Sequence, residues 1–125
     1  MRNMSFMLTS EQIINRTKTV TRRLGWRHLK PGDRIAACRK CMGLKKGEKI
    51  ERIAELRVTS VRQERLDRML DDDLYGMTEC ANEGFPDMTV DDFVDFFCRS
   101  HKGVYPETPI TRIEFEYCEP ESALV

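Results

Sequence analysis

The stretch TKTVTRR, residues 17–23, decides how the fold of this chain is interpreted. It is followed by Trp26 and by the turn Lys30-Pro31-Gly32-Asp33. From Arg16 to Lys30 there are six basic side chains and no acidic one, interleaved with three threonine hydroxyls and one indole. Like charges this close repel each other, so the segment is typical of a surface that faces an anion or lines a site. A solvated basic connecting strand is the simpler alternative.

The order of residues in this stretch favours an extended strand. Threonines at positions 17, 19 and 21 alternate with Lys18, Val20 and Arg22. In a regular strand Lys18 and Thr21 would point to opposite faces, whereas a bulge or turn would bring them together. The sequence leaves both arrangements open.

Several features together resemble the ASCH family, a branch of the PUA-like β-barrels. They are Lys18, then Arg23 after four residues, Thr21 between them, the Pro31-Gly32-Asp33 turn, the segment Glu83-Gly84-Phe85 and the closing strand 110–117. The likeness covers residues 4–118 and is greatest to the small ASCH proteins of phages and prophages. The family often has a glycine two residues before the lysine. This chain has Arg16 there, so a different local backbone is expected.

Length and composition set the broad class of the protein. A chain of 125 residues predicts one domain, here residues 1–125. It has no apolar run long enough to span a bilayer and no apolar signal-peptide core, so a cytoplasmic protein without a membrane partner is expected. Five cysteines, an odd number, indicate reduced thiols rather than a disulfide framework.

The net charge of zero conceals an asymmetry along the chain. Residues 1–62 contain sixteen Lys and Arg against five Asp and Glu, and residues 63–125 contain five against sixteen. Zero net charge argues against indiscriminate nucleic-acid binding, but the basic half can still form a local patch for phosphate. Mutual attraction of the two halves within one fold is the alternative.

Hydrophobic periodicity predicts strands towards both ends of the chain and helices in the middle. The expected strands are 4–8, 34–38, 54–61 and 110–117, with a turn at 45–48 that suggests a hairpin. A short helix is expected at 9–15 and another at the acidic run 71–73. This order suits an α+β fold with a small mixed β-barrel and helices inserted on one side. The resemblance implies that the barrel is PUA-like.

The clearest predicted helix begins at Thr89 and stops near Gly103. Apolar residues follow at i, i+3, i+4 and i+7, namely Val90, Phe93, Val94 and Phe97. An aromatic stripe with this spacing is typical of a buried face, so Phe93 and Phe97 are predicted to lie in the core.

The resemblance implies a catalytic hypothesis for Lys18, Thr21 and Glu83. In one ASCH branch a lysine, a threonine and a glutamate form the site of an amidohydrolase that removes the acetyl group from N4-acetylcytidine. Thr21 would be the nucleophile and Lys18 its general base, with a pKa lowered by burial and by the neighbours Arg22 and Arg23. Glu83 would shuttle the proton, and Arg23 would contact the substrate or the oxyanion. A plain Lys18–Glu83 salt bridge between the helical insert and the barrel is the structural alternative.

The basic segment also supports a binding hypothesis, which is the preferred one. The expected contacts to phosphate come from Arg22, Arg23, Arg27 and Lys30, and Lys45, Lys46 and Lys49 extend this track. Trp26 would stack on an exposed base, which favours single-stranded RNA or a modified nucleoside as the partner. A tryptophan in such a position is, however, more often a half-buried lid over the core than a stacking platform.

Two pairs of residues have the spacing of zinc ligands, Cys38 with Cys41 and Cys98 with His101. They lack the glycine-rich context of zinc knuckles, Cys98 lies in an apolar helix, and the ASCH family needs no zinc. Neither a metal nor another cofactor is therefore predicted.

The sequence thus predicts an ASCH-type domain that binds RNA or a modified nucleotide through residues 18–30. The amidohydrolase is the first alternative. A ribonuclease is another, disfavoured because no clear His/Glu or multi-carboxylate metal constellation is present. A third is a phage protein that engages a host protein through its acidic half, at residues 71–73 or 91–95.

Overall fold

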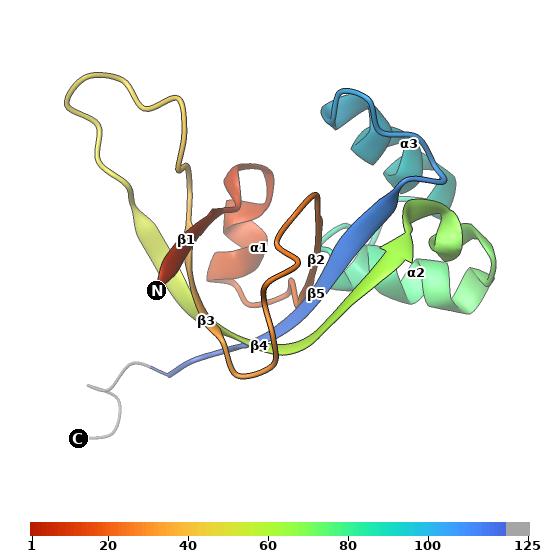
Figure 1. Cartoon of the computed structure of the whole chain (residues 1–125), viewed down its shortest axis with the longest axis horizontal. Coiled ribbons are helices and arrows are strands. Elements are labelled where there is room, and N and C mark those ends of the chain that lie inside the picture. The colour runs from red at the N-terminus through yellow and green to blue at the C-terminus, as the bar shows by residue number, and fades with distance from the viewer. Residues whose placement is uncertain (120–125) are drawn as a thin grey trace.

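The computed structural model describes residues 1–119, and its centre is one curled sheet of five strands. The strands are β1 (Arg2–Ser5), β2 (Val20–Arg23), β3 (Arg34–Cys38), β4 (Arg52–Arg65) and β5 (Pro109–Tyr117). Their order is β1-β3-β4-β5-β2, with β1 parallel to β3 and every other pair antiparallel. Figure 1 shows the long strands β4 and β5 curving below α1 and β2 as a half-barrel. This confirms the predicted α+β class.

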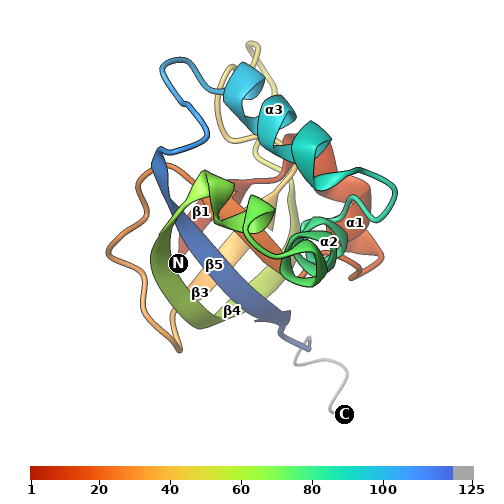
Figure 2. The same ribbon diagram turned by 90° about the vertical axis from the view of Figure 1, so that its right-hand side faces the viewer.

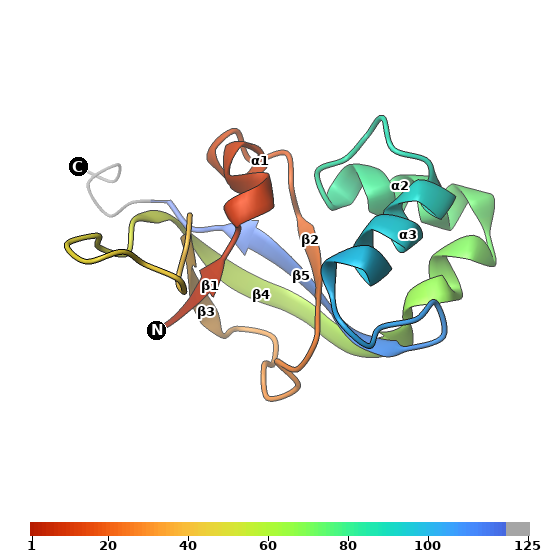
Figure 3. The ribbon, with the colours of Figure 1, turned by 90° about the horizontal axis from the view of Figure 1, so that it is seen from above.

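The helices lie mainly at one end of the sheet. They are α1 (Ser10–Ile14), α2 (Asp73–Asn82) and α3 (Val90–Ser100), with 3-10 helices η1 (Met7–Thr9) and η2 (Leu66–Leu70). Between β4 and β5 the chain forms η2, α2 and α3, which gather beyond β2 in Figure 3. The insertion on one side is therefore confirmed. None of the helices described in residues 1–119 has the length and apolar character needed to cross a membrane.

Side-chain caps set the starts of both inserted helices. The Asp72 carboxylate accepts a hydrogen bond from the Tyr75 amide at 3.0 Å, and the Thr89 hydroxyl accepts one from the Asp92 amide at 3.1 Å. Each cap satisfies an amide that has no partner within its helix. The predicted helix start at Thr89 is confirmed, and α3 ends at Ser100, before Gly103.

The prediction of a strand at residues 4–8 is wrong in its second half. The Phe6 amide donates to the Cys38 carbonyl at 2.7 Å, and the chain then turns into η1. The Phe6 carbonyl accepts from the Thr9 amide at 3.0 Å and from the Ser10 hydroxyl at 2.8 Å. These hydrogen bonds turn the backbone into η1 instead of continuing the strand, and the Phe6 side chain is buried in the barrel.

Two apolar clusters form the core of the described chain. The barrel cluster contains Met4, Phe6, Ile13, Leu29, Ile35, Ala37, Leu56, Val58, Ile113 and Phe115. The helical cluster contains Leu66, Met69, Cys80, Phe93, Val94, Phe97, Val104 and Ile110. The predicted burial of Phe93 and Phe97 is thus confirmed. Strand β5 joins the clusters, since Ile110 belongs to one and Ile113 to the other.

Candidate functional site

Lys18 lies in the loop before β2, not within a strand. The backbone amides of Thr17 and Lys18 donate to the Gln12 carbonyl, at 2.9 and 3.1 Å, and the Thr19 amide donates to the Asn82 carbonyl at 2.8 Å. The Lys18 carbonyl accepts from the Tyr117 hydroxyl at 2.6 Å. Because of these bonds, residues 17–19 do not continue the strand. The alternation that would point Lys18 and Thr21 to opposite faces therefore does not apply to Lys18.

Arg16, at the position where the resemblance expects a glycine, has a φ of +63°. This is the left-handed conformation that glycine adopts without strain. Arg16 therefore takes a backbone conformation that is more usual for glycine. The guanidinium of Arg16 lies 5.5 Å from the centre of the Tyr117 ring.

Glu83 approaches Lys18 from the C-terminal end of α2. The Lys18 ammonium donates to the Glu83 carboxylate at 2.8 Å and to the Glu83 backbone carbonyl at 2.6 Å. Gly84 follows with a φ of +99°, and a Cβ atom there would lie 2.9 Å from Gln12 Cγ. The Gln12 side chain also donates to the Gly84 carbonyl at 3.1 Å. Helix α1 therefore positions both partners of the ion pair through one residue.

Arg22 holds the other side of Glu83. Its guanidinium is fully buried and donates to Glu83 at 3.3 Å, to Glu79 at 2.6 Å and to Glu64 at 3.0 Å. The Tyr75 hydroxyl lies 3.3 Å from the same group. A guanidinium already paired with three carboxylates is not available to a phosphate, so Arg22 supports Glu83 in the site.

Glu79 is the second carboxylate of this buried network. It is 2% exposed and also receives hydrogen bonds from Arg112, one of them at 3.0 Å. Burial alone would raise its pKa, but the bonds and charges of Arg112 and Arg22 outweigh this and lower it to about 2. Glu79 therefore stays ionised at neutral pH and pins α2 to β2 and β5.

Thr21 and Arg23 form the β2 side of the site. Arg23 Nε donates to the Thr21 hydroxyl at 3.0 Å, and Arg23 Nη2 donates to the Ser5 carbonyl at 2.7 Å. The guanidinium lies 4.7 Å from the centre of the Phe6 ring. Burial lowers the pKa of Arg23 to about 10, which still leaves it protonated at neutral pH. The Thr21 oxygen is thus held in place with its own proton free to be donated.

These residues meet at one cavity of about 220 Å³. Its polar lining contains Lys18, Thr21, Arg22, Arg23 and Glu83, so Lys18 and Thr21 border the same cavity. The opposite wall is aromatic and comes mainly from α3 and its ends: Phe85, Phe93, Phe96, Phe97 and His101. Figure 2 shows α3 lying across this end of the molecule beside α2.

The electrostatics of the cavity centre on Lys18. Burial is the largest influence on its pKa and lowers it, and the charges of Arg23 and Arg22 act in the same direction. Glu83 opposes them through its charge and its hydrogen bond, yet the pKa remains below the ordinary value of 10.5. A lysine in this state gives up its proton more readily than an exposed one, as a general base requires.

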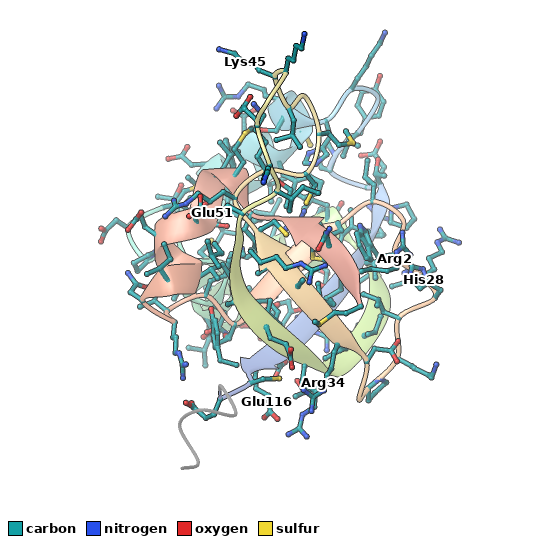
Figure 4. All side chains as sticks on the ribbon, turned by 90° about the vertical axis from the view of Figure 1, so that its left-hand side faces the viewer. Arg2, His28, Arg34, Lys45, Glu51 and Glu116 are labelled. Atoms are coloured by element: carbon teal, nitrogen blue, oxygen red, sulfur yellow. The ribbon has the colours of Figure 1, made fainter. Side chains whose placement is uncertain are left out.

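The structure does not bring Trp26, Arg27 and Lys30 to this cavity. Trp26 is half buried against the barrel cluster, stacks on His28 with ring centres 5.8 Å apart, and has the Arg2 guanidinium 4.5 Å above it. Arg2 and His28 project together from one side of the sheet in Figure 4. Arg27 is exposed, and Lys30 lies 3.7 Å from Asp33 in the same loop. The basic segment is therefore divided: residues 18–23 contribute to the cavity, and residues 26–30 lie outside it.

No group of three His, Cys, Asp or Glu residues within 1–119 has an arrangement that could hold a metal ion. His101 instead stacks on Phe97, with ring centres 4.2 Å apart, and its Nδ1 donates to the Phe97 carbonyl at 2.8 Å. Burial raises the pKa of the Cys38 thiol to about 11, which keeps it protonated.

Several site residues were missed by sequence reasoning. Glu79 stands four residues before Glu83, and this spacing on a helix puts both carboxylates on one face, so it was a usable signal. Phe96 and His101 gave no such signal. Their place in the cavity depends on how α3 packs against η2 and α2, which no local pattern encodes.

The sequence matches no protein-family model and no curated protein. Three solved structures share its fold. The hypothetical protein PH0355 has a TM-score of 0.62 and 19% identity, over 94% of this chain and 96% of that one. The ASCH domain from Lactobacillus crispatus JV V101 has a TM-score of 0.59 and 14% identity, over 93% and 78% of the two chains. Protein EF3133 from Enterococcus faecalis V583 has a TM-score of 0.54 and 15% identity, over 89% and 67%.

These similarities extend over nearly the whole of the described chain. They agree with the curled five-stranded sheet and the helical insert between β4 and β5. The chain therefore has the fold of an ASCH domain.

Proposed function

We propose that this chain, which has the fold of ASCH domains, binds one modified nucleoside in the cavity between β2 and α3, either free or within RNA. The convergence of Lys18, Thr21, Arg23 and Glu83 opposite an aromatic wall carries this proposal. The cavity of about 220 Å³ is smaller than the pockets that hold drug-sized ligands, and its size suits a single base. The aromatic side supplies a stacking surface, and the polar side supplies hydrogen bonds to the edge of the base.

A second candidate function is hydrolysis of an acyl amide on that base. The buried Lys18 with its lowered pKa, in one cavity with Thr21, favours it. The Thr21 oxygen would attack the acyl carbon while neutral Lys18 accepts the hydroxyl proton. Arg23, which already donates to the Thr21 oxygen, would stabilise the oxyanion. Lys18 would then protonate the departing amine, and water would release the acyl group from Thr21.

Binding and turnover of N4-acetylcytidine test both candidates in one series. The wild-type protein is expected to bind the nucleoside by calorimetry and to release cytidine and acetate, followed by chromatography. Thr21→Val keeps the shape of the residue and removes the nucleophile, so it should abolish turnover and keep binding. If the wild type binds the nucleoside but does not turn it over, the hydrolysis candidate is rejected and the binding proposal is kept. Absence of binding by every form would reject the proposed function.

The pH dependence of turnover follows from the state of Lys18. Because its pKa lies below 10.5, a growing fraction becomes neutral as pH rises towards that lowered pKa. The rate should therefore rise with pH and level off above this pKa, with the point of levelling below 10.5. A rate that stays constant from acid to alkaline pH would exclude Lys18 as the base.

A further inference from the structure

A second cavity adjoins the site through η1. It has a volume of about 450 Å³ and lies beside the loop of residues 39–51 between β3 and β4. Met7 and Leu8 line both this cavity and the one that contains Lys18. The two hollows therefore meet at η1, and a chain that leaves one across this ridge enters the other.

The ridge itself is apolar and exposed. Met7 is 62% exposed and Leu8 64% exposed, although Phe6 immediately before them is buried. Their outward position adds nothing to the barrel core. Two neighbouring apolar side chains between two hollows offer a surface against which the face of a base can pack.

Each glutamate of the second cavity lies near a cation, and Arg39 serves two of the three. Arg39 lies 3.0 Å from Glu51 and 3.8 Å from Glu11, and Lys40 lies 3.9 Å from Glu48. These pairs leave the remaining cations of the loop without acidic partners.

Those cations are Lys45, Lys46 and Lys49. No carboxylate within residues 1–119 forms an ion pair with any of them. Lys49 lines the second cavity, and Lys45 stands at the tip of the loop in Figure 4, at the opposite end of the molecule from Arg34. Figure 1 shows the loop and α3 rising on opposite sides of α1 and β2. Of the three, Lys49 borders the same cavity as Met7 and Leu8, and Lys45 and Lys46 lie further along the loop. Unpaired cations near an apolar surface favour a ligand with both phosphates and bases.

We propose that η1 and the β3–β4 loop form a groove for single-stranded RNA whose modified base occupies the cavity beside Lys18. This inference rests on the proposed function and names its substrate class: a nucleotide within a strand, which makes contacts that the free nucleoside lacks. The base enters the first cavity, the adjoining nucleotide packs on Met7 and Leu8, and the following phosphates contact the loop lysines. The free nucleoside reaches none of these lysines.

The experiment compares N4-acetylcytidine with a short single-stranded RNA that carries this nucleoside at its centre. The test variant changes Lys45, Lys46 and Lys49 to glutamine. Three lost phosphate contacts reduce the slope of log affinity against log salt by about 2 for a single strand. The variant should show this reduction with the RNA and bind the free nucleoside as the wild type does.

A control variant changes Arg34, Arg57 and Arg65 to glutamine. It loses the same charge from exposed positions on β3 and β4 outside both cavities. Its salt slope with the RNA should equal that of the wild type. An equal reduction of the salt slope in both variants would show that only the net charge matters, and it would overturn the proposed groove.

The remaining outcomes separate the groove from the proposed function. Nucleoside binding together with an unchanged RNA salt slope in the lysine variant would overturn the groove and keep the proposed function. Lysine-dependent binding of the RNA with no preference for the acetylated base would overturn the proposed function and keep the groove. Failure of the wild type to bind either probe would overturn both.

Discussion

At the scale of single residues, the site depends on how few partners hold Lys18. Its ammonium donates only to Glu83 among the residues described, through the carboxylate and the carbonyl. Arg22, in contrast, has three carboxylates around it. The loss of Glu83 therefore affects Lys18 far more than Arg22.

Glu83→Leu should therefore lower the free energy of unfolding by about 3–5 kcal/mol, because it leaves a buried lysine without its counter-ion. Adding Lys18→Met should recover most of this loss, since Arg22 keeps Glu64 and Glu79. Urea unfolding of the two single variants and the double variant measures the coupling. Simply additive losses would contradict the interpretation of Lys18 and Glu83 as a strongly coupled buried pair.

Arg16 provides a second test at the residue scale, because its φ of +63° is strained for any residue with a Cβ atom. Arg16→Gly relieves this strain, whereas Arg16→Val makes it worse through the branched side chain. Both lose the same contact to Tyr117, so the glycine variant should be more stable than the valine variant by about 1–2 kcal/mol. Equal stabilities by thermal unfolding would argue against the left-handed conformation.

At the scale of elements, α2 is attached to the sheet mainly by charge. Glu79 joins it to Arg22 of β2 and Arg112 of β5, and the pKa of this carboxylate lies at about 2. An unfolded glutamate titrates near 4.3, so the stabilisation is complete above that pH and is lost as pH falls towards 2. Between these two pH values the free energy of unfolding of the wild type should fall by about 3 kcal/mol through protonation of Glu79.

Glu79→Gln removes the titrating group and leaves two buried guanidinium groups short of a partner. The variant should be less stable than the wild type by about 3 kcal/mol at pH 7, and the difference should shrink as pH falls towards 2. Urea unfolding at a series of pH values checks the sign. A difference that grows on acidification would show that Glu79 does not carry the charge.

At the scale of the whole molecule, the barrel and the helical insert should unfold together. Their two apolar clusters share β5, and the buried network of Arg22, Glu79 and Glu83 crosses between them. Trp26, the single tryptophan of the chain, packs on the barrel cluster and therefore reports on the barrel.

Leu66→Ala in the helical cluster should cost about 2–5 kcal/mol, because Leu66 is fully buried there. Trp26 fluorescence and far-ultraviolet circular dichroism should then shift together to the same lower midpoint. If the helical circular dichroism is lost at a lower midpoint than the Trp26 fluorescence changes, the barrel and the helical insert unfold as two separate cooperative units.

The asymmetry of charge also belongs to this scale. Some charges of the two halves form ion pairs inside the fold. Lys18 and Arg22 of the basic half pair with Glu79 and Glu83 of the acidic half. The predicted attraction between the halves is therefore present at this contact. The loop lysines show that the basic half also keeps cations without such partners in the described chain.

The sequence by itself determined the features that local physics encodes. Alternation of apolar and polar residues located β4 and β5, and the Thr89 cap with its apolar stripe located α3, because side-chain periodicity follows directly from backbone geometry. The resemblance to ASCH proteins pointed to Lys18, Thr21 and Glu83, which all line one cavity in the structure.

Tertiary structure alone decided the geometry of the site. The carbonyls of Gln12 and Asn82 take the amides that a strand through residues 17–19 would have used, so Lys18 leaves the strand register. Arg22 was expected at a phosphate and lies instead among carboxylates from two other elements. Such outcomes depend on which distant segments pack together and bury their charges, and no pattern within one segment of the chain contains that information.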